Sequence, residues 1–195
     1  THILQLDQVA GFPRFLNQIF GRLFVPNQNL PSFKLEGGAV WAESKLTGLG
    51  RIHSTLFTAT LRAQALSGRL YNLAQLTHVP PNWPDANIWY MYGGHFVHWL
   101  VSQYGSEWIR DIHRQIADDL LPFGINRATQ KATGETLVNL YRRWQNHLVV
   151  SARRVQKRLS IDGLSKLSPL TSDGRQKSHL RLTEDGQLLS LESGH

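Results

Sequence analysis

The pattern of apolar and polar positions over the first 150 residues predicts a mainly helical domain. Apolar side chains recur three and four positions apart, which places them on one face of a helix. In the last predicted helix these residues form the expected core face, Leu137, Leu140, Tyr141, Trp144 and Leu148. The spacing predicts helices over residues 15–23, 36–47, 56–66, 89–104, 106–116 and 137–148, after a helix end at residues 1–10.

Glycine and proline separate these segments. Gly48 and Gly50 follow Thr47, where glycine takes the left-handed conformation that ends a helix. Residues 26–31 lie between two prolines and are expected to form a loop. Residues 79–84 contain three prolines, which lack the amide hydrogen and fix φ, so this stretch is expected to be neither helix nor central strand.

The character of the sequence changes after about residue 160. Ser172-Asp173-Gly174 and Glu184-Asp185-Gly186 are turn signals, each next to short segments with alternating leucines. This pattern predicts a β-hairpin, in a stretch too short to form a stable sheet alone. We therefore divide the chain into a helical part over 1–150, a basic linker over 151–165 and a hairpin-containing segment over 166–195.

Composition and charge limit the possible functions. A chain of 195 residues with 41% hydrophobic content can bury a substantial core. No apolar run approaches the roughly 20 residues of a membrane-spanning helix, so no membrane span is expected. Cysteine is absent, which excludes disulfides and thiolate metal sites.

The net charge of +7 is concentrated near the C-terminus. From Arg153 to Arg181 the chain has eight basic and two acidic residues and no aromatic residue. Nucleic-acid interfaces usually combine basic residues with a recognisable motif, and none is present here, so we expect a solvated linker and no nucleic-acid partner. The alternative, binding of an anionic polymer by the tail, predicts a steep dependence on salt.

The candidate chemistry lies near the N-terminus. Glu36 and Glu43 are seven residues apart, two helical turns, and share one helix face. His2 stands in a helix-like run before them, and His-Glu-x-x-His helices use two histidines to hold zinc and the glutamate as general base. By themselves, His2 as a surface histidine and Glu36 as a glutamate favoured by the helix dipole remain open interpretations. The small residues after Glu36 allow a second helix to approach closely.

Three segments together resemble the aminopeptidase-N-like gluzincins. Residues 35–43 (Leu-Glu-Gly-Gly-Ala-Val-Trp-Ala-Glu) are similar to the Glu-Gly helix of that family, and residues 1–7 to the second half of its His-Glu-x-x-His helix. Tyr90-Met91-Tyr92-Gly93 resembles its later Tyr-x-x-Gly segment. The resemblance covers residues 1–148 and is greatest to bacterial peptidase-MA-like domains that precede a TolB-like β-propeller. It implies a fold class of mainly α, the helical C-terminal part of a gluzincin domain, with a short β-hairpin-like tail that starts a propeller.

The resemblance also implies roles for individual residues. His2 and Glu36 would be zinc ligands, Glu43 a carboxylate that orients a ligand imidazole or a neighbouring polar group, and Tyr90 the oxyanion donor, a role for which Tyr92 competes. The substrate would be a peptide or protein, and the location the bacterial periplasm or cell envelope. The first histidine and the general base would precede Thr1, so we expect this chain alone to be inactive and to bind zinc weakly or not at all.

Several alternatives remain open. The interval of 34 residues from His2 to Glu36 is longer than in compact gluzincins and requires an insertion that contains the helix over 15–23. His95 and His98 are three apart and either chelate a metal or pack in the fold. Arg51 either meets a substrate carboxylate or is an ordinary surface arginine, which we favour. The alternative function is a non-catalytic helical interaction domain attached to a β-propeller.

Overall fold

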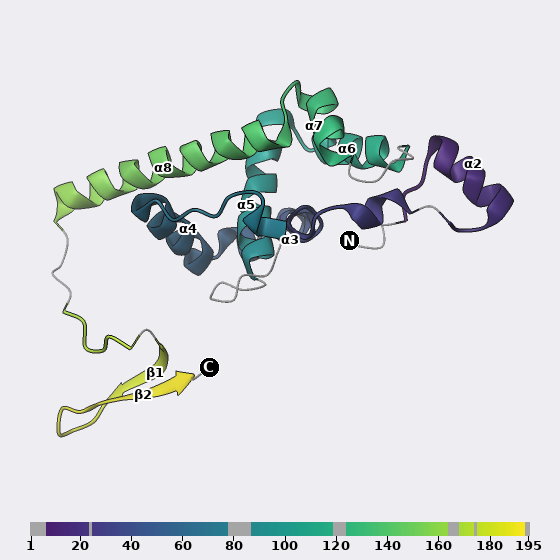
Figure 1. Cartoon of the computed structure of the whole chain (residues 1–195). Coiled ribbons are helices and arrows are strands. Elements are labelled where there is room, and N and C mark those ends of the chain that lie inside the picture. The colour runs from purple at the N-terminus through teal and green to yellow at the C-terminus, as the bar shows by residue number, and fades with distance from the viewer. Residues whose placement is uncertain are drawn as a thin grey trace. The chain divides into compact units, whose positions relative to one another are not determined.

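A computed structural model describes residues 7–23, 25–77, 87–118, 124–163, 168–173 and 175–193. The chain divides into two compact units after Arg158. The described residues are mainly helical and end in a short antiparallel hairpin, which confirms the prediction of a mainly α chain with a hairpin-like tail (Figure 1). His2 and the proline-rich stretch 79–84 lie outside the described residues.

The helical unit contains most of the elements that the sequence predicts. Its helices are α2 (Gly11–Phe20), α3 (Ser32–Thr47), α4 (Thr55–Ser67), α5 (Asn87–Tyr104), α6 (Glu107–Ala117), α7 (Ile125–Thr133) and α8 (Leu137–Asp162). Short 3-10 turns form at η1 (Pro26–Asn29), η2 (Arg51–His53) and η3 (Gln75–Thr77).

The predicted helix ends can be compared with the observed ones. Gly48 ends α3 in the left-handed conformation with φ 68°, as predicted. α2 begins at Gly11, four residues earlier than the predicted start, and α7 was not predicted. Ser106 precedes α6, but its side chain makes no capping hydrogen bond. α8 continues to Asp162, so most of the stretch predicted as a basic linker is helical.

The core of the helical unit is built around α5 and is rich in aromatic side chains. Phe96 of α5 packs edge-to-face against Tyr141 of α8, with ring centroids 5.1 Å apart, and lies 5.4 Å from Trp144. Such pairs add to the burial of apolar area. Four of the five residues predicted on the core face of α8 are buried and Leu148 is partly buried, which confirms that prediction.

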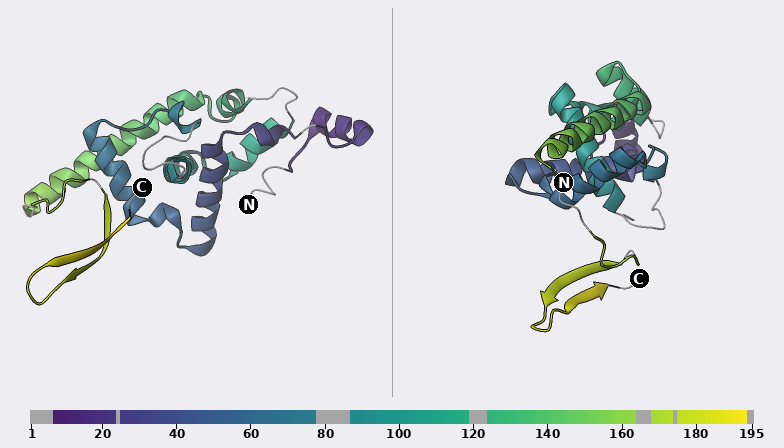
Figure 2. Two further views of the ribbon diagram at one scale, coloured as in Figure 1. Left: turned by 60° about the horizontal axis from the view of Figure 1, so that its bottom comes forward. Right: turned by 90° about the vertical axis from the view of Figure 1, so that its left-hand side faces the viewer.

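Helices α3 and α5 pack against each other (Figure 2). Their backbones are in contact at glycines. A Cβ atom added to Gly37 would lie 2.4 Å from the carbonyl carbon and oxygen of Gly93. A Cβ added to Gly93 would lie 2.2 Å from the carbonyl oxygen of Phe33. Since real Cβ atoms do not approach so closely, only glycine fits at these two positions. The close helix approach predicted after Glu36 is therefore confirmed, and α5 is the approaching helix.

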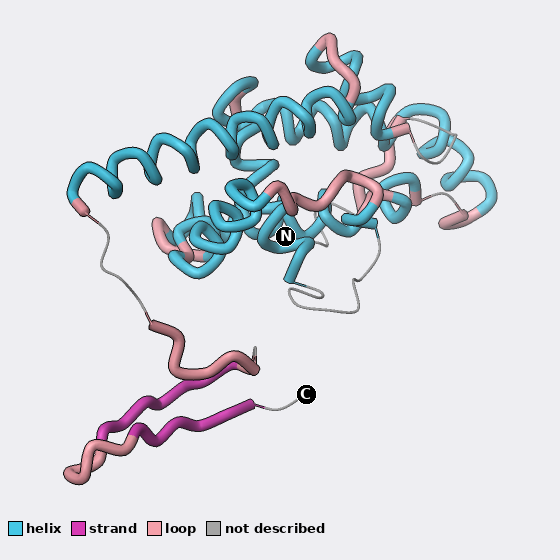
Figure 3. Tube along the Cα trace, turned by 60° about the vertical axis from the view of Figure 1, so that its left-hand side comes forward, coloured by secondary structure: helices cyan, strands magenta, loops and turns pink. Residues whose placement is uncertain are grey.

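The second unit contains a two-stranded antiparallel hairpin, β1 (Gln176–Leu182) and β2 (Leu188–Ser193) (Figure 3). The predicted signal Glu184-Asp185-Gly186 forms its turn, with Gly186 at φ 82°. The Thr183 hydroxyl accepts a hydrogen bond from the backbone N–H of Gln187 at 2.9 Å and closes the turn. None of the described helices is long and apolar enough to cross a membrane.

Helix α6 carries a buried histidine. His113 is 3% exposed, and its Nδ1 lies 2.8 Å from the carbonyl oxygen of Ile109. Burial, and secondarily the nearby Lys34 ammonium, lowers the pKa of His113 to about 4. The folded chain therefore favours the neutral imidazole.

We expect His113 to make the fold acid-sensitive. Its pKa is lower in the folded than in the unfolded chain, so its contribution is fully present above about pH 6.5 and is lost as the pH falls toward about 4. Urea unfolding at about pH 4.5 and pH 7 should show a loss of roughly 2–3 kcal/mol in wild type that His113→Gln lacks. His179→Gln, at an exposed histidine, serves as the control. Equal acid sensitivity of His113→Gln and wild type would contradict this assignment.

Candidate metal and catalytic site

Helix α3 carries both carboxylates of the predicted site. α3 is continuous from Ser32 to Thr47, so Glu36 and Glu43 lie two turns apart on one helix. Glu36 is half-buried and directly precedes Gly37, where α3 meets α5. The sequence places Glu36 at this crossing because Gly37 and Gly93 remove the side chains that would otherwise separate the two helices.

Glu43 is held by an arginine from the following turn. Nε and Nη2 of Arg51 donate hydrogen bonds to Oε2 of Glu43, at 3.0 Å and 2.8 Å. The two side chains are 42% and 39% exposed, so solvent screens the pair and its contribution to stability is modest. The main consequence is geometric, because two donors to one oxygen fix the guanidinium plane.

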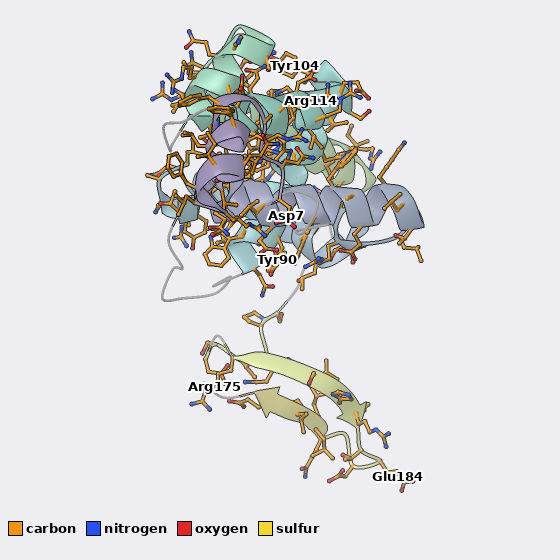
Figure 4. All side chains as sticks on the ribbon, turned by 90° about the vertical axis from the view of Figure 1, so that its right-hand side faces the viewer. Asp7, Tyr90, Tyr104, Arg114, Arg175 and Glu184 are labelled. Atoms are coloured by element: carbon orange, nitrogen blue, oxygen red, sulfur yellow. The ribbon has the colours of Figure 1, made fainter. Side chains whose placement is uncertain are left out.

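The same arginine contacts Tyr90. The Arg51 guanidinium carbon lies 4.6 Å from the centroid of the Tyr90 ring, a cation–π contact. Tyr90 is half-buried and lies in the first turn of α5 (Figure 4). Glu43, Arg51 and Tyr90 thus form a continuous set of contacts from α3 through η2 to α5. Arg51, which is not among the predicted site residues, therefore joins two that are, Glu43 and Tyr90.

The turn between α3 and η2 determines the position of Arg51. Gly48 and Gly50 have φ values of 68° and 95°, which reverse the chain so that η2 runs back along α3. The Ser44 hydroxyl accepts a hydrogen bond from the N–H of Ile52 at 3.3 Å and donates one to the carbonyl of Val40 at 2.9 Å. The sequence favours Arg51 as an ordinary surface arginine; in the structure its guanidinium contacts both Glu43 and Tyr90. The Gly48-Leu49-Gly50 turn before it is the signal that could have indicated this.

Tyr92, the competing tyrosine, is part of the core. Its side chain is 0% exposed, its hydroxyl donates to Oε1 of Gln64, and it accepts a hydrogen bond from the N–H of Tyr71 at 3.3 Å. Burial raises the pKa of Tyr92 well above its usual value. Of the two tyrosines, Tyr90 therefore has the more accessible side chain.

The predicted zinc ligands are only partly covered by the structure. His2 lies outside the described residues. In the parts of the chain that the structure describes, no three His, Cys, Asp or Glu side chains gather as a metal site would require. Glu36 fits one ligand position by chemistry, because zinc accepts carboxylate oxygens and this carboxylate is half-buried.

The two histidines of α5 have different environments. His95 is half-buried, and its Nδ1 lies 2.8 Å from the carbonyl oxygen of Met91 on the same helix. Burial lowers the pKa of His95, so the neutral ring is favoured. His98 is exposed. His95 therefore matches the interpretation of a histidine packed in the fold.

Comparison with known protein families, curated proteins and solved structures gives no match to this chain.

Proposed function

We propose that this chain contributes the glutamate and tyrosine side of a zinc metallopeptidase active site, of the gluzincin type that its sequence resembles. The observation that carries the proposal is the contact of α3, which bears Glu36, with α5, which bears Tyr90, reinforced by the Arg51 link. His2 and Glu36 would hold the zinc together with a histidine that precedes Thr1.

Zinc, when bound, activates a water molecule and polarises the substrate carbonyl. Tyr90 would donate a hydrogen bond from its hydroxyl to the oxyanion that develops on that carbonyl. Arg51 would keep the Tyr90 ring in position, because its guanidinium covers the ring and is itself fixed by Glu43. In this arrangement Glu43 acts through Arg51, whereas the resemblance also allowed it to orient a ligand imidazole.

The hairpin of the second unit supports the other part of the proposal, a β-propeller that follows the helical domain. Its leucines are 47–73% exposed, namely Leu180, Leu182, Leu188, Leu189 and Leu191. An isolated two-stranded hairpin is marginally stable, so these side chains suit packing against further strands. A periplasmic or cell-envelope location and a peptide or protein substrate belong to the same proposal.

Three substitutions test the site. They are made in a longer protein, expressed from the gene with the regions that flank this chain. Glu36→Gln should lower both the zinc content and peptide hydrolysis, because it removes a charged ligand. Tyr90→Phe should keep zinc and KM but lower kcat by about 10²–10³ fold, because only the oxyanion donor is lost. Tyr104→Phe, at the other end of α5, is the matched control and should leave hydrolysis unchanged.

The alternative is the non-catalytic helical interaction domain. It would be supported if the wild-type protein held no zinc and cleaved no peptide while Glu36→Gln folded normally. Normal kcat in Tyr90→Phe would remove Tyr90 from the proposed chemistry even if zinc-dependent hydrolysis were found.

A further inference from the structure

Helix α2 has an exposed apolar face. Phe12, Phe15 and Ile19 are three and four residues apart and lie on one side of the helix, with exposed fractions of 55%, 53% and 57%. The rings of Phe12 and Phe15 stack with centroids 6.3 Å apart. Phe20, at the end of the helix, is 65% exposed. We call the side formed by Phe12, Phe15 and Ile19 the aromatic face of α2.

The helical unit gives α2 little support. Pro13 is the one buried residue of this helix, and Figure 1 shows α2 at the edge of the unit. Isolated helices shorter than about 12–15 residues are marginal in water, and α2 has 10 residues. A partner outside this unit that covered the aromatic face would therefore stabilise α2.

Charge indicates what kind of partner this is. Residues 8–35 contain no acidic residue but include two exposed basic ones, Arg14 and Arg22. Arg14 is exposed and lies away from the aromatic face, and Arg22, just after the helix, is 64% exposed while pairing with Asp7. A helix with phenylalanines on one side, an arginine on the other and no acidic residue suits the interface of an anionic bilayer, where apolar side chains enter the headgroup boundary and a cation meets the phosphates.

We propose that α2 docks on an anionic lipid surface, with its aromatic face in the boundary between headgroups and acyl chains and Arg14 among the phosphates. A second copy of the chain fits less well, because a stable dimer interface takes about 20–30 residues a side and the aromatic face has three side chains. This docking is independent of the peptidase proposal, since neither Glu36 nor Tyr90 takes part.

Co-sedimentation with vesicles tests the docking of the 195-residue chain. The chain should bind to phosphatidylcholine vesicles that contain about 30% phosphatidylglycerol, and much less to vesicles of phosphatidylcholine alone. Added salt should weaken the binding. Phe15→Glu/Ile19→Glu should lower binding to the anionic vesicles by about tenfold or more, because two apolar side chains lose their transfer into the interface. Both residues are exposed, so the variant keeps its fold. Leu46→Glu/Leu49→Glu, at leucines 84% and 74% exposed at the end of α3, is the matched control and should bind as wild type.

A fluorescent label reports the orientation of α2. The chain has no cysteine, so Ile19→Cys and Gln18→Cys each provide a single site for an environment-sensitive dye. Anionic vesicles should shift the emission at position 19 to the blue and leave position 18 close to its value in water. Equal binding of the Glu variant and wild type, equal shifts at both positions, or a concentration-dependent shift without lipid that indicates self-association would each overturn the proposal.

Discussion

Gly93→Ala is expected to lower the free energy of unfolding by about 2–3 kcal/mol, although alanine is the better helix former. The new Cβ would lie 2.2 Å from the carbonyl oxygen of Phe33 and 3.2 Å from the Cα of Gly37. Both are backbone atoms of α3, so the clash cannot be relieved by a side-chain rotation. α3 must move away from α5 and lose part of the packing between the two helices.

Urea unfolding followed by far-UV circular dichroism measures this loss, with Gly105→Ala as the comparison. Gly105 ends α5 with φ +80° and has no atom within 4 Å of an added Cβ. Its substitution should cost about 1 kcal/mol from backbone strain alone. A cost for Gly93→Ala no greater than that of Gly105→Ala would show that the helix crossing is not as tight as described.

The same substitution affects the candidate site. Glu36 and Tyr90 are carried by the two helices that Gly93→Ala would push apart. The Glu43–Arg51–Tyr90 contacts span this pair of helices and depend on its geometry. Under the peptidase proposal, Gly93→Ala should therefore reduce kcat even at temperatures where the protein remains folded.

The fold was predictable where apolar periodicity is strong. α5 and α8 have buried faces with the spacing that the sequence shows, and glycine marks the end of α3. α7 was missed because its sequence, Ile-Asn-Arg-Ala-Thr-Gln-Lys-Ala-Thr, is mostly polar and offers few apolar positions. α2 starts earlier than predicted because Pro13 was interpreted as a helix end, whereas proline is tolerated in the first turn of a helix.

The candidate site was predictable only in part. Spacing places Glu36 and Glu43 on one helix, because a helix is a local structure with a fixed period. The contact of Arg51 with Tyr90 joins residues 39 positions apart and depends on how a turn and two helices pack. Periodicity contains no information about such a contact. The convergence of His2 and Glu36 stays a prediction, because His2 lies outside the described residues.

Lys34 has the most unfavourable environment of the charged side chains in the described core. It is 2% exposed, and its Nζ has no hydrogen-bond partner among the described residues. The ammonium lies 5.1 Å from the centroid of the Trp108 ring, which compensates only part of the lost hydration. Burial lowers the pKa of Lys34 from 10.5 to about 8.

This pKa shift determines how stability depends on pH. Because the folded chain binds the proton less tightly than the unfolded chain, the cost is fully present below about pH 8 and is relieved as the pH rises toward 10.5. The shift corresponds to an upper limit of about 3 kcal/mol, because one pKa unit is about 1.4 kcal/mol. Lys34 therefore destabilises the fold at neutral pH.

Lys34→Met is accordingly expected to stabilise the protein by about 2 kcal/mol at pH 7, because methionine has a similar length, fills the same space and needs no hydration. The advantage over wild type should shrink at about pH 10, where wild-type Lys34 is largely neutral in the fold. Urea unfolding of both proteins at the two pH values measures this, with the exposed Lys45→Met as a control that should change stability by less than about 0.5 kcal/mol. If Lys34→Met were less stable than wild type, or equally advantageous at both pH values, the buried ammonium would have a partner that this structure does not describe.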